Sequence, residues 1–311
     1  MKKSNRVYGI IAIGAYMANF NADLSGYPKA TNNNDIFGSD KALKYPMKRM
    51  WLLQGKPVLY IKSYIKSTKS GEGSEKMQPR DLNERYTKLF GALDDKTSSS
   101  EVLGKLFSAV DVMNFGATFA EKKQNISITG AVQINQGLNR FQNTNVLSQD
   151  ILSPFRNSNE KSEEKLASSM GTKIVTDEAH YVYSFSVNPA NYGDFIGLAD
   201  GFEGYTAEAY EEFKWAAKVA TTAFNTNSKS GCENELSLFI ELKEDSKLFL
   251  ANLDRYVKVH KKGEYVLYDL TKLAEILAPH QDEIQSIELH MNPAAVKVDY
   301  ASLPCTVKSI Y

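Results

Sequence analysis

The most suggestive spacing of reactive side chains in this sequence is a set of lysines. Lys41, Lys44 and Lys48 lie at positions i, i+3 and i+7, so they share one face if the segment is helical, and Arg49 follows directly. Such a row suits the phosphates of a nucleic acid, whose contacts give affinity that is independent of base sequence and falls as salt rises. The same row is also typical of a solvated helix face, so both interpretations remain open on spacing alone.

The sequence contains no recognisable motif of catalytic side chains. The four histidines have no metal-ligand spacing from one another, and only Cys232 and Cys305 are present. No phosphate-binding loop of the GxxxxGK[ST] or GxGxxG type and no GxSxG nucleophile elbow occurs. Adjacent carboxylates such as Asp94 and Asp95 lie in polar contexts typical of solvated charge. The sequence therefore predicts a protein that is not an enzyme and uses no cofactor and no metal.

Charge is divided along the chain although the formal net charge is zero. Residues 1–80 carry 14 Lys+Arg against 5 Asp+Glu, a balance of +9, and residues 81–311 carry 23 against 32, a balance of −9. This division suits a polyanion on the basic part and a neighbouring copy against the acidic part. Ordinary enzymes also segregate charge in this way, so the pattern indicates a nucleic-acid partner without requiring one.

Composition indicates a globular protein in a reducing compartment. The chain has 311 residues, of which 42% are hydrophobic and 24% charged, and two cysteines do not specify a disulfide framework. The apolar run from Val7 to Phe20 contains glycines and a tyrosine and is shorter than the ~20 apolar residues that span a bilayer. We therefore expect a buried strand there, no membrane partner and a cytoplasmic location.

The elements that must position the lysines alternate between strands and helices. Apolar alternation predicts strands, helical spacing predicts helices, and the resulting order is strand, helix, strand, strand, helix, strand. That order is typical of a ferredoxin-like or RRM-like α+β sheet, a frame that supports many functions. The expected strands are 7–17, 58–64, 125–135, 181–187 and 236–242, and the expected helices are 39–53, with Pro46 kinking or restarting it, and 206–224.

Several stretches lie outside this frame. Residues 19–38 and 67–79 have the composition of exposed loops. Residues 145–178 are mostly polar and too long for a hairpin turn between two strands, so we expect them to protrude or to be disordered, either as a solvated loop or as a binding arm. Residues 255–291, with a short helix at 270–277 ended by Pro279, are expected to form a closing lobe.

Five segments, taken in order, resemble a known family. They read NFNADLSGYPKA, GSDKALKYPMKR, VDVMNFGATFA, ITGAVQINQGLN and SSMGTKIVTDEAHYVYSFSVNP. Together they are similar to the backbone subunits of CRISPR Cascade surveillance complexes, in their type I-B branch, from about Val7 to Pro189. The resemblance implies one RRM-like domain over 1–311 with a finger region at about 19–56 and 65–124, a β-hairpin-like thumb at about 145–178 and a C-terminal lobe at about 245–311.

The resemblance also implies partners and a mode of action. The subunit would polymerise with further copies of itself along a CRISPR RNA (crRNA), beside other Cascade subunits, in antiviral defence. Its thumb, with a tip around Met170 to Lys173, would part the guide bases and kink the RNA, so that short runs of bases pair with target DNA. The residues that the likeness places at the RNA are Asn21, Lys29, Ser39, Lys41, Lys44, Lys48, Arg49, Gln133, Asn135, Met170, Lys173 and Lys229.

This sequence departs from the family pattern at two places, and two rival functions remain. The first loop reads NFNADLSG where the family usually reads close to NPNGDPD, and Met113 stands where a basic residue is common. Related type III subunits cleave target RNA with an aspartate in a comparable loop, which here is Asp23. The rivals are therefore an RNase that uses Asp23 and a generic single-stranded RNA binder with a preference for particular bases.

Overall fold

The structure, a computed structural model, describes residues 1–68, 75–94, 96–156 and 168–311. Within these residues a nine-stranded sheet forms the centre of the molecule, in the order β16-β14-β11-β1-β10-β8-β2, with β7 and β9 also paired to β10. Its strands are β1 Val7–Ala18, β2 Phe37–Gly38, β7 Val132–Ile134, β8 Gly137–Asn139, β9 Val146–Arg156, β10 Ser168–Val187, β11 Cys232–Leu242, β14 Ile284–Met291 and β16 Thr306–Ser309.

The middle of this sheet has ferredoxin-like topology. Strand β1 lies between β10 and β11 and is antiparallel to both, and β7 is antiparallel to β10 on its other side. The chain runs β1, α1 (Asp40–Leu53), β7, β10, α5 (Ala207–Ala223) and β11, so each of the two helices connects strands that are separated by one other strand. The predicted α+β fold class is confirmed.

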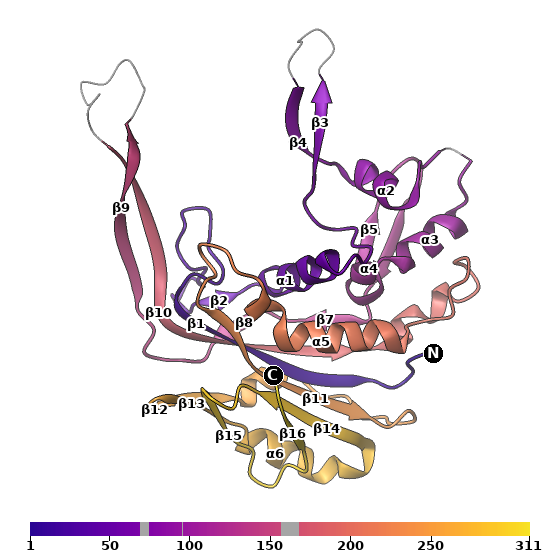
Figure 1. The fold of residues 1–311 in the computed structure, drawn as a ribbon. Helices are drawn as coiled ribbons and strands as arrows, with labels where there is room; N and C mark the ends of the chain where they lie inside the picture. The colour runs from indigo at the N-terminus through magenta and orange to yellow at the C-terminus, as the bar shows by residue number, and fades with distance from the viewer. Residues whose placement is uncertain (69–74, 95, 157–167) are drawn as a thin grey trace.

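The sheet is covered on both faces (Figure 1). Helices α1 and α5 lie on one face, against Ile11 and Ile13 of β1, while the C-terminal lobe lies on the other, against Ile10 and Ala12. Because successive side chains of a strand point to opposite faces, this double coverage explains why β1 is apolar almost throughout. The lobe consists of β12 Lys258–Lys262, β13 Tyr265–Asp269, α6 Thr271–Leu277 and β15 Val296–Asp299, with β14 and β16 continuing the main sheet.

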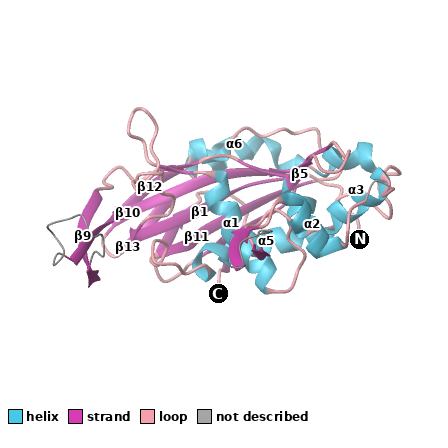
Figure 2. Ribbon diagram, turned by 90° about the horizontal axis from the view of Figure 1, so that it is seen from above, coloured by secondary structure: helices cyan, strands magenta, loops and turns pink. Residues whose placement is uncertain are grey.

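A second lobe is inserted between α1 and β7. Figure 2 shows its helices α2 and α3 at one end of the sheet and β9 at the opposite end. The lobe comprises β3 Tyr64–Thr68, β4 Glu75–Pro79, α2 Leu82–Phe90, α3 Ser99–Ser108, α4 Val110–Phe115, β5 Gly116–Phe119 and β6 Ile126–Thr129. Short 3-10 helices occur outside this lobe, at Pro189–Phe195, Leu253–Tyr256 and Ala278–Glu283.

Three of the expected elements differ from the structure. The strand predicted at 58–64 is wrong, because the backbone N–H groups of Leu59 and Tyr60 donate to the Asp111 carboxylate, each at 2.8 Å, instead of pairing with a strand. The single strand predicted at 125–135 is divided into β6 and β7 at Gly130, where a Cβ atom would lie 2.2 Å from the backbone carbon of Phe115. The loop predicted at 67–79 is partly the β3–β4 hairpin, and residues 69–74 lie outside the described part of the chain.

The two long helices begin and end as their sequences indicate. Ser39 precedes α1, and its hydroxyl accepts a hydrogen bond from the Ala42 N–H at 3.2 Å. Gly55, just after the helix, has φ +79°, a conformation that favours glycine. Thr206 caps α5 in the same way as Ser39 caps α1. Pro46 is buried inside α1, and the helix continues through it without restarting, while the alternative of a kink at Pro46 stays a prediction.

The polar insertion at 145–178 is a long antiparallel hairpin that projects from the sheet (Figure 1). Its strands β9 and β10 pair from Val146 opposite Thr176 to Arg156 opposite Ser168. The prediction that this segment protrudes is therefore confirmed, while residues 157–167 lie outside the described part of the chain. None of the described helices is both long and apolar enough to cross a bilayer.

Candidate nucleic-acid interface

The first loop and the start of α1 form one surface. The side-chain oxygen of Asn21 accepts a hydrogen bond from the Ser39 N–H at 2.8 Å, and the backbone carbonyl of Asn21 accepts one from the Lys29 N–H at 2.8 Å. Lys41, in the first turn of the helix, is exposed. The structure thus brings Asn21, Lys29, Ser39 and Lys41 together at a helix N-terminus, where the helix dipole favours anions.

The other lysines of α1 point into the molecule. Lys44 is only 16% exposed and pairs with Asp40 at 3.0 Å, and its ammonium lies 5.1 Å from the centre of the Phe115 ring. Lys48 lies 3.6 Å from the fully buried carboxylate of Asp111. Burial lowers the pKa of Lys48, although Asp111 opposes that shift. The helix predicted to carry these lysines is therefore confirmed. The prediction that Lys41, Lys44 and Lys48 form one open row on it is wrong.

Lys48 also contributes to the second lobe. Its ammonium donates a hydrogen bond to the carbonyl of Tyr60 at 3.2 Å, next to the two N–H groups that Asp111 binds. Arg49, the next residue, lies half-buried beside Met50 in a shallow groove between α1 and the end of α5. For Lys48 the structure gives a role in joining α1 to the inserted lobe, and its contact with RNA stays a prediction.

Lys229 is turned back onto the first loop. Its ammonium donates to the backbone carbonyl of Phe20 and lies 4.5 Å from the centre of the Phe20 ring. Burial lowers the pKa of Lys229. The side chain therefore fixes the beginning of the loop that holds Asn21, and its predicted contact with the RNA backbone is not tested by these contacts.

The foot of the hairpin adjoins the same loop. Asn19 donates from its side chain to the carbonyls of Gly26 at 2.9 Å and Ile174 at 3.2 Å, which ties the loop to β10. Lys173 and Ser228 line the resulting groove, which has a volume of about 210 Å³. Three segments that are far apart in the sequence, residues 19–29, 172–175 and 227–229, thus meet at one place.

The hairpin prediction needs one correction. Met170 and Lys173 do not form the tip, because Met170 pairs with Leu152 and Lys173 with Gln149 along the hairpin. The connection between β9 and β10 falls at residues 157–167, outside the described part of the chain, and the same holds for the side chain of Met170. Lys173 lies near the foot, within reach of the first loop.

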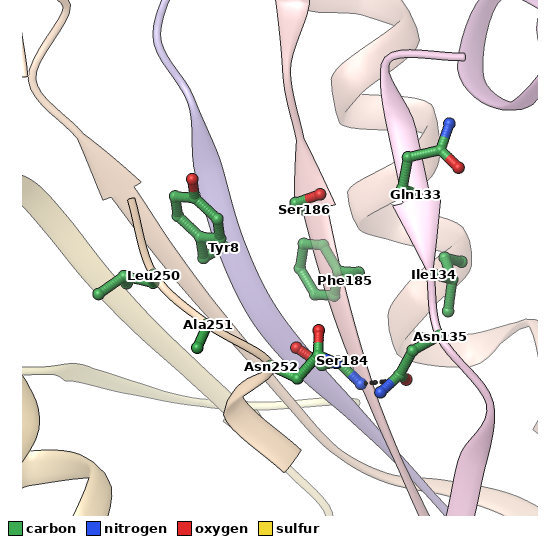
Figure 3. A pocket seen from close by; sticks show the side chains of 10 residues that line it. All are labelled: Tyr8, Gln133, Ile134, Asn135, Ser184, Phe185, Ser186, Leu250, Ala251 and Asn252. Atoms are coloured by element: carbon green, nitrogen blue, oxygen red, sulfur yellow. Dashed lines mark hydrogen bonds between the residues drawn. The ribbon is translucent and has the colours of Figure 1, made fainter. Parts of the chain in front are cut away.

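Gln133 and Asn135 lie on the other face of the sheet. Figure 3 shows Gln133 on β7 and Asn135 just after it, beside Ser184 on β10, around a pocket of about 250 Å³ that is also bounded by Leu250–Asn252. The Asn135 amide is engaged on both sides, donating to Asp254 at 2.9 Å and accepting from the Ser184 N–H at 2.8 Å. Val132 and Ile134 face the helices instead. The structure therefore separates these two predicted contacts from those near α1.

A buried polar cluster joins the sheet to the lobe. The carboxylate of Glu235, which has no solvent exposure, accepts hydrogen bonds from the hydroxyls of Tyr16 and Tyr268, each at 2.5 Å. It also lies 2.7 Å from Nδ1 of His180, whose ring is buried as well. Burial, reinforced by the charge of Glu235, raises the pKa of both tyrosines. These residues are far apart along the chain, so no local pattern of residues predicts that they form a cluster.

The cluster continues to the foot of the hairpin. Nε2 of His180 lies 3.2 Å from Glu178, and the other oxygen of Glu178 pairs with Lys261 of β12 at 2.5 Å. Both ring nitrogens of His180 face carboxylates, which accept hydrogen bonds, and a doubly protonated ring would donate to both. Burial by itself would lower the pKa of His180, but the charge and hydrogen bond of Glu235 raise it. The network fixes the lobe against β10.

The side chain of Asp23 forms hydrogen bonds within the first loop. One carboxylate oxygen accepts hydrogen bonds from the N–H groups of Ser25 at 2.8 Å and Tyr27 at 3.0 Å, which closes the turn of the first loop. In the part of the chain that the structure describes, no group of three or more His, Cys, Asp and Glu side chains is arranged to hold a metal ion.

Comparison with known proteins decides the family. The sequence matches the family described as CRISPR-associated protein Cas7 over residues 5–279. The chain belongs to the Cas7 family. No curated protein matches it. Solved structures are similar to the Cas7 fold seen here: a chain of a "CRISPR RNA-guided surveillance complex, pre-nicking" has a TM-score of 0.57 and 14% identity over 98% of this chain and 96% of its own.

A second solved chain, from a "CRISPR RNA-guided surveillance complex", has a TM-score of 0.50 and 15% identity over 95% of this chain and 93% of its own. This match, like the first, covers nearly the whole of both chains. The expected likeness to Cascade backbone subunits is thereby confirmed at the level of the Cas7 family.

Proposed function

We propose that this chain is the structural backbone subunit of a type I-B Cascade complex, which binds crRNA and performs no chemistry on it. The observation that carries the proposal is the meeting of the first loop, the start of α1 and the foot of the hairpin. Asn19 and Asn21 hold these segments together through side-chain hydrogen bonds to Ile174, Gly26 and Ser39. Membership of the Cas7 family supports the same function.

In this proposal each part of the surface has a separate task. The N–H groups at the start of α1, with Lys29 and Lys41 nearby, bind guide phosphates without reading bases. The projecting β9–β10 hairpin parts successive bases, which costs a few kcal/mol of unstacking that the backbone contacts offset. The bases between two hairpins of neighbouring copies are then displayed for pairing with target DNA in antiviral defence in the cytoplasm.

The two rival functions have less support. A generic RRM stacks bases on the open face of its sheet, but here Ile10, Ala12 and Val182 on that face are buried against the lobe. An RNase that uses Asp23 would need a free carboxylate oriented toward RNA. One oxygen of the Asp23 carboxylate instead accepts the two N–H groups that shape the loop. We therefore keep the non-enzymatic proposal.

Binding to guides of unrelated sequence tests the proposal. Two crRNAs with the same repeat but unrelated spacers should bind with equal affinity, since the proposed contacts are to phosphates. For a single strand, the logarithm of the association constant should fall with the logarithm of salt with a slope of about −0.7 for each phosphate neutralised. A preference of about tenfold or more for one spacer would favour the sequence-selective rival.

A further inference from the structure

A groove on the lobe side of the hairpin foot is lined by cations that the proposed guide interface does not use. It lies between the loop that joins β8 to β9 and the strand β12, and has a volume of about 500 Å³. We call it the β12 groove. Its lining residues include Arg140, Phe141, Asn143, Arg255, Lys258 and Lys261.

The groove is open along an edge of the lobe. Among the described strands β12 pairs only with β13, so its other edge faces the loop at 140–143. Arg140 and Arg255 also line a neighbouring hollow of about 640 Å³ that reaches Thr31 and Phe37 of the first loop. The two hollows therefore form one path from the first loop to β12, along the seam between the sheet and the lobe.

The charges along this path favour an anion. Four cations and no acidic side chain line the β12 groove, and the neighbouring hollow is lined by Arg140, Arg255 and one acidic residue, Asp254. Two of the cations are engaged internally, Arg140 with the buried Asp254 at 2.7 Å and Lys261 with Glu178 at 2.5 Å. Arg255 and Lys258 are exposed. Asp269 lies opposite Lys258 in the pairing of β12 with β13 and offsets part of its charge.

The uncharged lining has the chemistry of a nucleotide site. The amides of Gln142 and Asn143 are exposed and offer both donors and acceptors. The half-buried ring of Phe141 lies beside them and makes an edge contact with His180, their ring centres 5.3 Å apart. Positive side chains with a nearby aromatic ring are the usual means of binding single strands, because phosphates supply the charge and bases supply rings that stack.

We propose that the β12 groove binds the backbone of a second single-stranded nucleic acid, distinct from the guide at the α1 interface. This inference rests on the proposed function, since pairing of a guide with duplex DNA releases one unpaired strand. The hairpin stands between the two sites: its foot contributes Lys173 and Ile174 to the groove beside the first loop, and Glu178 holds Lys261 of the β12 groove.

The test uses the guide-loaded assembly and a labelled oligonucleotide that is not complementary to the guide. The variant Arg255→Glu with Lys258→Glu should bind this oligonucleotide about tenfold less tightly, with the salt slope reduced by about 1.4, which is two phosphate contacts at about 0.7 each. Guide content, measured by the absorbance ratio and by extraction of the RNA, should be unchanged.

The matched control changes the same charge elsewhere on the lobe. Lys272→Glu with Lys297→Glu alters two exposed lysines, one on α6 and one on β15 at the opposite edge of the same small sheet. This control should bind the oligonucleotide as the unchanged protein does. The same measurement is made with oligothymidine, a DNA strand, and with oligouridine, an RNA strand. If the groove variant binds both more weakly than the unchanged protein does, the groove accepts either kind of strand. If it binds only oligothymidine more weakly, the groove is specific for DNA.

Other outcomes would overturn the inference. Equal binding by the groove variant and the control would exclude the groove as a nucleic-acid site while leaving the proposed function intact. Loss of the guide from the groove variant would assign Arg255 and Lys258 to the guide interface. If copies of the groove variant failed to associate in the absence of any oligonucleotide, the groove would instead bind an acidic segment of a neighbouring protein. An unchanged assembly that holds no guide would instead contradict the proposed function itself.

Discussion

The cations of α1 and those of β12 carry the same formal charge in very different surroundings. On α1, Lys44 and Lys48 are mostly buried, and each pairs with a carboxylate of the same chain. On and beside β12, Arg255 and Lys258 remain exposed. The cause is architectural: α1 is covered by the inserted lobe, whereas β12 is an edge strand, and no described strand pairs with its open side. The comparison teaches that lysine spacing measures charge along the chain and not charge available to a ligand.

The largest expected effect comes from removing the buried cation of α1. Lys48→Met should destabilise the protein by about 3 kcal/mol, because the Asp111 carboxylate would remain buried without its counter-charge. Urea denaturation at neutral pH measures the loss as a lower midpoint with an unchanged slope. This is a stability effect and should appear in protein that is free of RNA.

Lys41 provides the matched control on the same helix. Because Lys41 is exposed, Lys41→Met should change the free energy of unfolding by less than about 0.5 kcal/mol. It should nevertheless weaken guide binding and reduce the salt slope by about one contact. If both variants left stability unchanged and weakened binding equally, α1 would present the open lysine row after all.

A smaller effect concerns the buried cluster that holds the lobe on the sheet. The pKa of His180 is raised in the folded protein by the carboxylate of Glu235. The stability that charged His180 contributes is therefore fully present below the unfolded-state pKa of about 6.5 and is lost as pH rises through the higher folded-state pKa. The difference in unfolding free energy between the unchanged protein and His180→Gln should shrink as pH rises from about 6 to about 9.

His290 gives a control of opposite sign. Burial, with the nearby charge of Lys218, lowers its pKa despite the contact with Glu288. A lowered histidine pKa means that the unfolded chain binds more protons, so this group adds stability as pH rises. His290→Gln should therefore remove a contribution to the unfolding free energy that rises with pH, whereas His180→Gln should remove one that falls with pH. If the unfolding free energies of the two variants depended on pH in the same way, the surroundings described for His180 and His290 would be contradicted.

The sequence could predict the elements whose pattern is local. The apolar run of β1, the Ser39 cap with Gly55 after α1, and the Thr206 cap of α5 each depend on neighbouring residues, and all were correctly placed. The protruding segment at 145–178 was also predictable, since its polarity and length exclude a buried position.

What failed depends on contacts between distant residues. The strand expected at 58–64 is replaced by an irregular segment because Asp111, far along the chain, takes its N–H groups. The internal partners of Lys48 and Lys229, which are Asp111 and the Phe20 carbonyl, were also not foreseen, while the predicted contacts of both lysines with RNA stay predictions. Spacing cannot reveal such partners, because they are brought together only when the inserted lobe and the first loop pack against α1.

The nucleic acid carried by the purified assembly tests the central claim most directly. Extraction and sequencing of its RNA should recover CRISPR transcripts with many different spacers, in proportion to their abundance, because phosphate contacts do not select bases. Recovery of no RNA, or of cellular RNAs that share a base motif, would contradict a guide-carrying backbone subunit.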